Sequence, residues 1–113
     1  MTATAPQASV QVALNHAMNL LARDPVLAEE QARQILRAVP GLPPARLILG
    51  MAHNAQGHFT QAVAELQPLA VEQPDAPVVQ MEAGLALAAL GRHPEAIEAL
   101  QKAASLPPAL PGV

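Results

Sequence analysis

PPARLILGMAHNAQGHFTQAVAELQPLAVEQPDA (residues 43–76) is followed directly by PVVQMEAGLALAALGRHPEAIEALQKAASLPPAL (residues 77–110), and the two stretches align without a gap over 34 positions. A fixed period of this length is typical of stacked repeat proteins, in which each unit covers part of the next. The alignment therefore predicts a solenoid, and a solenoid indicates a protein that binds a partner molecule along its surface. Ten of the 34 aligned positions carry the same residue in both stretches. Four of these ten are the pairs Gly50 and Gly84, Gly57 and Gly91, Ala62 and Ala96, and Pro74 and Pro108.

The composition limits how this chain can build a core. Hydrophobic residues make up 51% of its 113 residues, but Phe59 is the only aromatic residue. Ala, Leu, Val, Ile and Met must therefore fill the interior, and Ala and Leu favour closely packed helices. The length suits one domain with a modest core.

The charge pattern and the residue types exclude several classes of function. The formal net charge is −3 with no basic stripe, so we expect no nucleic-acid binding. There is no cysteine, which removes disulfides and thiolate metal sites. We expect no membrane partner, because the longest apolar run (residues 83–90) is too short to span a bilayer. The first ten residues lack the pattern of a signal peptide, so the default localisation is cytoplasmic.

Proline and glycine divide the chain into six predicted helices. Asp24 fits an N-cap and Pro25 the first helical position, while Gly57 and Gly91 are typical helix stops. No stretch alternates in the manner of a strand, so the predicted class is all-α. The expected helices cover about residues 9–22, 25–38, 43–56, 59–72, 77–90 and 94–105.

The period also predicts the domain organisation. Residues 1–8 are expected to be a flexible leader, and residues 9–108 form the repeat domain, with units at about 9–42, 43–76 and 77–110. Residues 109–113 would begin a truncated fourth unit or form a tail. The helix at 94–105 would then lack a following helix. We therefore expect that the chain continues in a longer protein, or that this end pairs with a second copy.

These residues resemble the tetratricopeptide repeat family, whose unit is a helix–turn–helix of 34 residues. If Pro43 is position 1, the family's small residues near positions 8 and 20 correspond to Gly50 and Ala62, and its proline near position 32 to Pro74. Gly84, Ala96 and Pro108 repeat the pattern. The resemblance implies a right-handed α-solenoid of three units, in which small residues let two helices cross closely. The family's large aromatic residues near positions 4 and 11 are replaced by Arg46 and His53.

The same resemblance implies a binding groove lined by the first helix of each unit. Its lining positions are mostly apolar in this chain, which favours an apolar or amphipathic ligand. Family members that grip a C-terminal carboxylate use Lys, Arg and Asn there, and Asn54 alone fits, so that function is not expected. The implied groove residues are Leu20, Pro44, Leu47, Met51, Asn54, Val78, Met81, Leu85 and Ala88, preceded in the first helix by Val10, Ala13 and Ala17.

Metal and catalytic sites are not predicted. The four histidines are His16, His53, His58 and His93, and no pair has the i, i+4 spacing of a helical metal site. His53 and His58 flank the Gly57 turn and could approach each other. No nucleophile–base set and no phosphate-binding loop are visible. We therefore expect no catalytic residue, no cofactor and no bound metal.

A second resemblance concerns LARDPVLAEEQARQILRAVPG (21–41) and GLALAALGRHPEAIEALQKAASL (84–106). These phrases are similar to the repeat region of bacterial tetratricopeptide-containing sulfotransferases. In that family a separate C-terminal domain transfers a sulfuryl group from 3′-phosphoadenylyl sulfate. Its phosphate-binding residues have no counterpart here, so no catalytic residue is carried over.

The sequence thus predicts a non-enzymatic scaffold for protein–protein interaction. The expected partner is a protein or peptide, with a second copy of the chain as one option. The alternative is an accessory or dimerisation region of a larger sulfotransferase-like enzyme.

Overall fold

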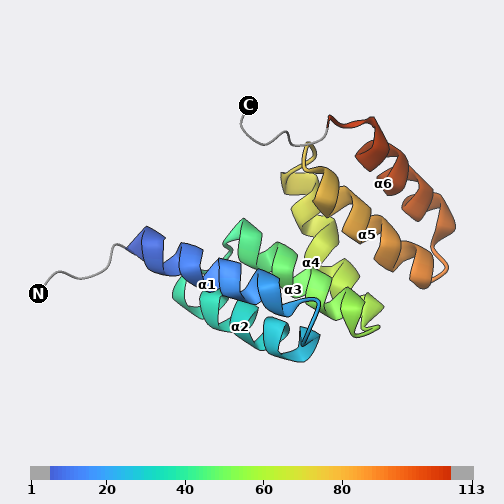
Figure 1. Ribbon diagram of the computed structural model, residues 1–113. Helices are drawn as coiled ribbons and strands as arrows, with labels where there is room; N and C mark the ends of the chain where they lie inside the picture. The colour runs from blue at the N-terminus through green and yellow to red at the C-terminus, as the bar shows by residue number, and fades with distance from the viewer. Residues whose placement is uncertain (1–5, 108–113) are drawn as a thin grey trace, which may run out of the picture.

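The computed structural model describes the backbone of residues 6–107 and the side chains of residues 9–107. The described chain is an all-α helical repeat solenoid with no strand, which confirms the predicted class (Figure 1). Pro108, residues 1–5 and residues 109–113 lie outside the described residues. The helices are α1 (Pro6–Leu20), α2 (Pro25–Ala38), α3 (Pro43–Ala55), α4 (Phe59–Glu72), α5 (Pro77–Ala89) and α6 (His93–Ser105).

Most helix ends lie within one residue of the predicted positions, and α1 differs most. It begins at Pro6, inside the segment expected to be a leader, and ends at Leu20. Proline is tolerated in the first turn because the N–H it lacks would have no helical partner there. Asp24 caps α2 as predicted, since its Oδ1 accepts a hydrogen bond from the Leu27 N–H at 3.1 Å.

The turn after α3 depends on one glycine in the left-handed conformation. Gly57 has a φ of 77°, and the N–H of the following His58 donates to the His53 carbonyl at 2.8 Å. The Gly57 N–H donates to the Asn54 carbonyl at 3.0 Å. These two bonds form a Schellman motif, which ends the helix and brings the residues at its two ends together. His53 and His58 occupy those two places.

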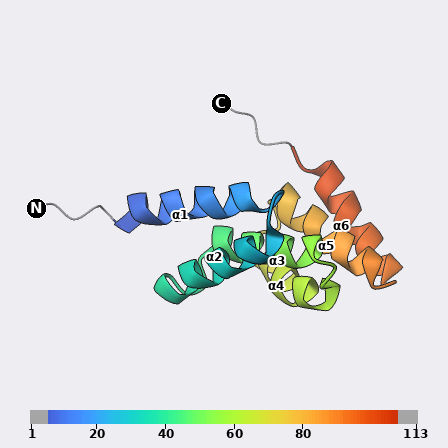
Figure 2. The same cartoon turned by 60° about the horizontal axis from the view of Figure 1, so that its bottom comes forward.

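The helices form two layers that differ in how closely they approach. α3 has Cα atoms within 8 Å of both α1 and α5. Among the described residues, no such approach occurs between α2 and α4 or between α4 and α6. In a curved stack, the helices of the inner layer lie closer to one another than the helices of the outer layer do. α1, α3 and α5 therefore form the inner layer and line the concave side. Figures 1 and 2 show the six helices stacked in chain order along one long axis.

Glycine residues, which have no side chain, allow the two helices of a unit to cross closely. A Cβ placed on Gly50 would lie 2.5 Å from Leu66 Cγ, and one placed on Gly84 would lie 2.7 Å from Leu100 Cγ. Ala62 and Ala96, the other small residues of the pattern, are buried. The small residues therefore stand where α3 meets α4 and where α5 meets α6.

Polar side chains replace the family's aromatic residues near position 4. Arg46 donates two hydrogen bonds of 2.9 Å to the Glu72 carboxylate and so joins the start of α3 to the end of α4. The buried Gln80 donates to the Ala70 carbonyl at 3.1 Å and satisfies part of the end of α4. Arg46 thus links the two helices of unit 2, and Gln80 links α5 of unit 3 to α4 of unit 2.

The outer face of α6 is more exposed than the matching face of α4. Ile97 is 54% exposed, whereas Val63, which precedes it by one period, is 7% exposed. Val63 packs in a core cluster with Leu66 of the same helix and Leu87 of α5. Within the part that the structure describes, no helix is both long and apolar enough to cross a membrane.

Candidate functional site

The concave side holds a first hollow between the ends of α1 and α3. It has a volume of about 410 Å³ and contains two of the residues expected in the groove, Met51 and Asn54. Both side chains are half-buried. A thioether here can adapt its shape to an apolar ligand. The remaining lining residues are Leu21, Ala22, Ala55 and Glu82.

The amide of Asn54 is already engaged by the next unit. Its Nδ2 donates to the carbonyl of Glu82 at 3.0 Å and to Glu82 Oε1 at 2.9 Å. Asn54 Oδ1 is buried and accepts no hydrogen bond from the described residues. The Asn54 donors are therefore unavailable to grip a carboxylate, and the Glu82 carboxylate gives this hollow a negative charge.

A second hollow, of about 250 Å³, lies between the first turns of α3 and α5. Pro44, Leu47 and Val78 were expected in the groove and line it. Leu47 also packs against the core, so only part of its side chain is accessible. Sequence reasoning missed five further lining residues: Pro43, Gln73, Ala76, Pro77 and Val79.

An exposed apolar row runs along α5 beside these hollows. Val78, Met81 and Leu85 follow the spacing i, i+3, i+7, which places them on one face of the helix. They are 44%, 41% and 48% exposed. All three are among the groove positions that the family resemblance implies.

Not every expected groove residue faces the groove. Leu20 was expected to project into it but is buried, packed in a cluster with Ala28 of α2 and Ala52 of α3. Leu20 is the last residue of α1, and the small side chains of Ala28 and Ala52 leave space in which it packs. Ala17 is buried as well, and Ala88 packs against the core around Leu87.

Glu82 is the most informative residue that the sequence analysis missed. It lies on α5 one residue after Met81, in a helix that is otherwise almost entirely apolar. A single carboxylate in such a helix is a signal that could have been noticed. Its contact with Asn54 depends on the stacking of two units and is not visible in either unit alone.

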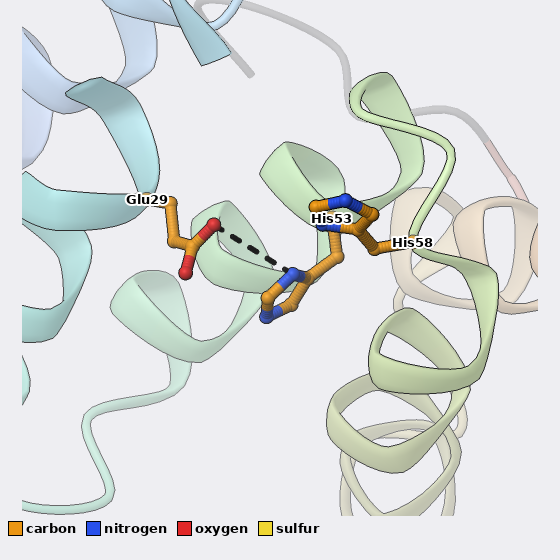
Figure 3. Close-up of side chains that lie close together, drawn as sticks. All are labelled: Glu29, His53 and His58. Carbon is orange, nitrogen blue, oxygen red and sulfur yellow. Dashed lines mark ion pairs between the residues drawn. The ribbon is translucent and has the colours of Figure 1, made fainter. Parts of the chain in front are cut away.

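The two histidines that flank Gly57 approach each other, with ring centroids 6.2 Å apart. His53 is 3% exposed, and its Nδ1 lies 3.8 Å from Oε1 of Glu29 in the preceding unit (Figure 3). Burial lowers the pKa of His53 below its usual value, an effect opposed by the nearby Glu29 carboxylate. His53 is thus favoured in the neutral form, whose unprotonated nitrogen can bind a cation.

Hydrogen bonds fix the Glu29 carboxylate in this position. Gln56 donates to its Oε1 at 2.8 Å, and Arg33 donates to its Oε2 from Nε at 3.0 Å. The hydrogen bond from Gln56 is the main reason that the pKa of Glu29 lies below its usual value. The contact between units 1 and 2 is therefore polar here, whereas Val63 and Leu87 make the equivalent contact between units 2 and 3 apolar.

A family model described as Tetratricopeptide repeat matches residues 47–111, which is more than half of the chain. No curated protein matches the chain.

Proposed function

Because the chain belongs to the tetratricopeptide repeat family, whose repeats generally mediate protein–protein interactions, we propose that its concave groove binds an apolar or amphipathic segment of a partner protein. Members of this family are typically not enzymes, which agrees with a binding role. The observation that carries the proposal is the exposed row of Val78, Met81 and Leu85 on α5. Contiguous apolar surface of this kind is typical of sites that bind another chain.

The shape of the groove favours a helical or extended segment with apolar side chains on one side. The hollow at Met51 and the hollow at Leu47 lie near opposite ends of α3 and can each take an apolar side chain. Anchors spaced along one face of a helix are the usual way in which amphipathic segments fill such surfaces. The row on α5 would then cover the space between the two anchors.

Charge narrows the class of partner. Glu82 is the charged residue that lines the first hollow, and its carboxylate repels an anionic group. We propose that the polar edge of the bound segment is neutral or basic. A segment that enters with its terminal carboxylate is disfavoured for the same reason.

The test uses a fluorescent amphipathic peptide of Leu, Gln and Lys that forms a helix, with binding followed by fluorescence anisotropy. Met81→Gln and Met51→Gln keep the side-chain length and the helix propensity but remove apolar contact. Each should weaken binding about tenfold, since fully burying one such side chain contributes roughly 1.5–3 kcal/mol.

Val71→Gln is the matched control for this experiment. Val71 is the most exposed apolar residue of α4 in the outer layer, so the substitution should change binding less than about twofold. Circular dichroism should show equal helicity for all variants. Equal affinities of the wild type and the Met81 variant would exclude the groove as the binding surface.

A second copy of the chain is the other candidate partner, and the exposure of Ile97 on α6 favours it. In the two preceding units the equivalent face is covered by the following helix. If a second copy covers it, sedimentation equilibrium will show a mass that rises with concentration, and Ile97→Asp will abolish that rise. A constant monomer mass would exclude this pairing.

No contact among the described residues favours the role of a sulfotransferase accessory region.

A further inference from the structure

Three side chains with metal-binding groups meet at the junction of units 1 and 2. Glu29 comes from α2, His53 from the last turn of α3 and His58 from the turn that follows Gly57. One donor atom from each residue lies within 4.8 Å of the other two (Figure 3). The sequence analysis expected that His53 and His58 could approach each other, but it did not connect Glu29 with them because that carboxylate belongs to the preceding unit.

The buried member of this group has no other partner. His53 is almost completely buried, and its Nδ1 forms no hydrogen bond with the described residues. The same atom points toward Oε1 of Glu29, from which it is separated by 3.8 Å. Buried polar atoms nearly always have a partner, so an unpaired nitrogen that lies beside a carboxylate calls for a bound water or ion.

We propose that Glu29, His53 and His58 bind a divalent transition-metal ion, and that zinc is the ion that suits them best. Two imidazole nitrogens and one carboxylate oxygen are a common donor set for zinc, with a fourth position left to water or another ligand. Tetrahedral zinc places neighbouring donor atoms about 3.4 Å apart. His58 is exposed, so its side chain can rotate to shorten its distance to the other two donors.

Two residues beside the Glu29 carboxylate have opposite effects on a bound cation: Gln56 favours it, and the positive charge of Arg33 disfavours it. The hydrogen bond from Gln56 orients the Glu29 carboxylate, as partners of metal ligands usually do. Arg33 carries a positive charge, but it binds Oε2 and leaves Oε1 directed toward His53.

The site is separate from the groove of the proposed function. Asn54 follows His53 in the sequence, but its side chain contacts Glu82 on α5. An ion held by Glu29, His53 and His58 would join unit 1 to unit 2. The expected role is therefore structural, and the loss of peptide binding would not by itself remove metal binding.

The experiment uses the 113-residue chain without a polyhistidine tag, stripped of metal with a chelator. Zinc binding is measured by titration calorimetry and by the shift in the thermal unfolding midpoint. Cobalt is added in place of zinc to test the geometry, because tetrahedral cobalt absorbs visible light much more strongly than octahedral cobalt. We expect one ion per chain, a higher unfolding midpoint with zinc and a tetrahedral cobalt spectrum.

Two variants remove a ligand without an expected loss of the fold. His58 is exposed, so His58→Ala leaves the core intact. His53→Leu places at position 53 the residue that the next unit carries as Leu87 in the same buried place. Each variant should weaken zinc binding at least about tenfold.

His93→Ala is the matched control, because His93 is also exposed and also lies near a turn between two helices. It should bind zinc as the wild type does. If the wild type binds no zinc, or if the His58 and His53 variants bind it as tightly as the control, the proposal is wrong. Glu29 and His53 then form a simple ion pair when the histidine is protonated.

Discussion

Gly50 and Leu66 pack so closely that a single added carbon atom would overlap the leucine. A Cβ at position 50 would lie 2.5 Å from both Cγ and Cδ2 of Leu66. Leu66 is fully buried, so its side chain has no free space into which it can move. This contact fixes the distance between α3 and α4 in the middle unit.

Gly50→Ala should therefore destabilise the protein. Overpacking a core costs about 1–3 kcal/mol, and replacing glycine by alanine inside a helix returns roughly 1 kcal/mol. We expect a net loss of up to about 2 kcal/mol in the free energy of unfolding, measured by urea denaturation.

Gly84→Ala is the comparison for that variant. Its Cβ would meet Leu100 at 2.7 Å, but Leu100 is only partly buried and can move aside. The loss should be smaller than for Gly50→Ala. If Gly50→Ala were as stable as the wild type, close packing at this crossing would not limit the helix distance.

Pro68 offers a way to stabilise the protein. It lies inside α4, where its ring has no N–H to donate to the Ala64 carbonyl. The equivalent positions of the other units hold Gln34 and Lys102. Pro68→Gln should raise the free energy of unfolding by about 1–3 kcal/mol, as the midpoint of urea denaturation will show.

Pro94→Gln is the control for this prediction, because Pro94 lies in the first turn of α6, where proline suits a helix. The Pro94→Gln variant should have the same free energy of unfolding as the wild type or a slightly lower one. A Pro68 variant no more stable than the wild type would mean that α4 needs the bend that the ring imposes.

The pair of Arg46 and Glu72 gives stability a dependence on pH. The hydrogen bonds from Arg46 lower the pKa of Glu72 below its usual value of 4.5. Unfolding raises this pKa again, so the contribution of the pair is complete above pH 4.5 and is lost as the pH falls through the folded value. The effect is small because the Glu72 carboxylate is exposed.

Glu72→Gln tests this sign. The variant should be less stable than the wild type at pH 7, and the difference between the two urea midpoints should shrink at pH 3. A difference that stays constant between the two pH values would show that the charge of Glu72 does not contribute.

The groove should discriminate among ligands by charge. Glu82→Gln removes the negative charge beside Asn54 but keeps an oxygen that can accept its hydrogen bond. Binding of a lysine-containing amphipathic peptide should weaken about threefold to tenfold, and the dependence on salt should decrease. Glu98 on α6 lines neither hollow of the groove, so Glu98→Gln should have little effect on peptide binding. Equal losses from both variants would point to the net charge of the protein and not to the groove.

The sequence predicts most of the fold because the decisive signals are local. Asp24, Gly57 and Gly91 mark helix ends through hydrogen bonds that span only a few residues. The period of 34 then arranges the helices, since each unit contacts its neighbours alone. These features need no knowledge of distant contacts.

The site residues are less predictable because they depend on how units stack. The pairing of Asn54 with Glu82 and of His53 with Glu29 joins residues from different units. The burial of Leu20 depends on where α1 ends, which the repeat pattern does not specify for the first unit. The resemblance to the repeat family therefore implies the groove positions, but it does not reveal the polar contacts between units.

The two junctions of this stack have different chemistry. The junction between units 1 and 2 places the His53 imidazole 3.8 Å from the Glu29 carboxylate, a pair that is fully charged only when the histidine is protonated. The core cluster at the junction of Val63 and Leu87 is apolar and, among the described residues, contains no group that titrates. A change in pH should therefore affect the contact between units 1 and 2 more than the contact between units 2 and 3.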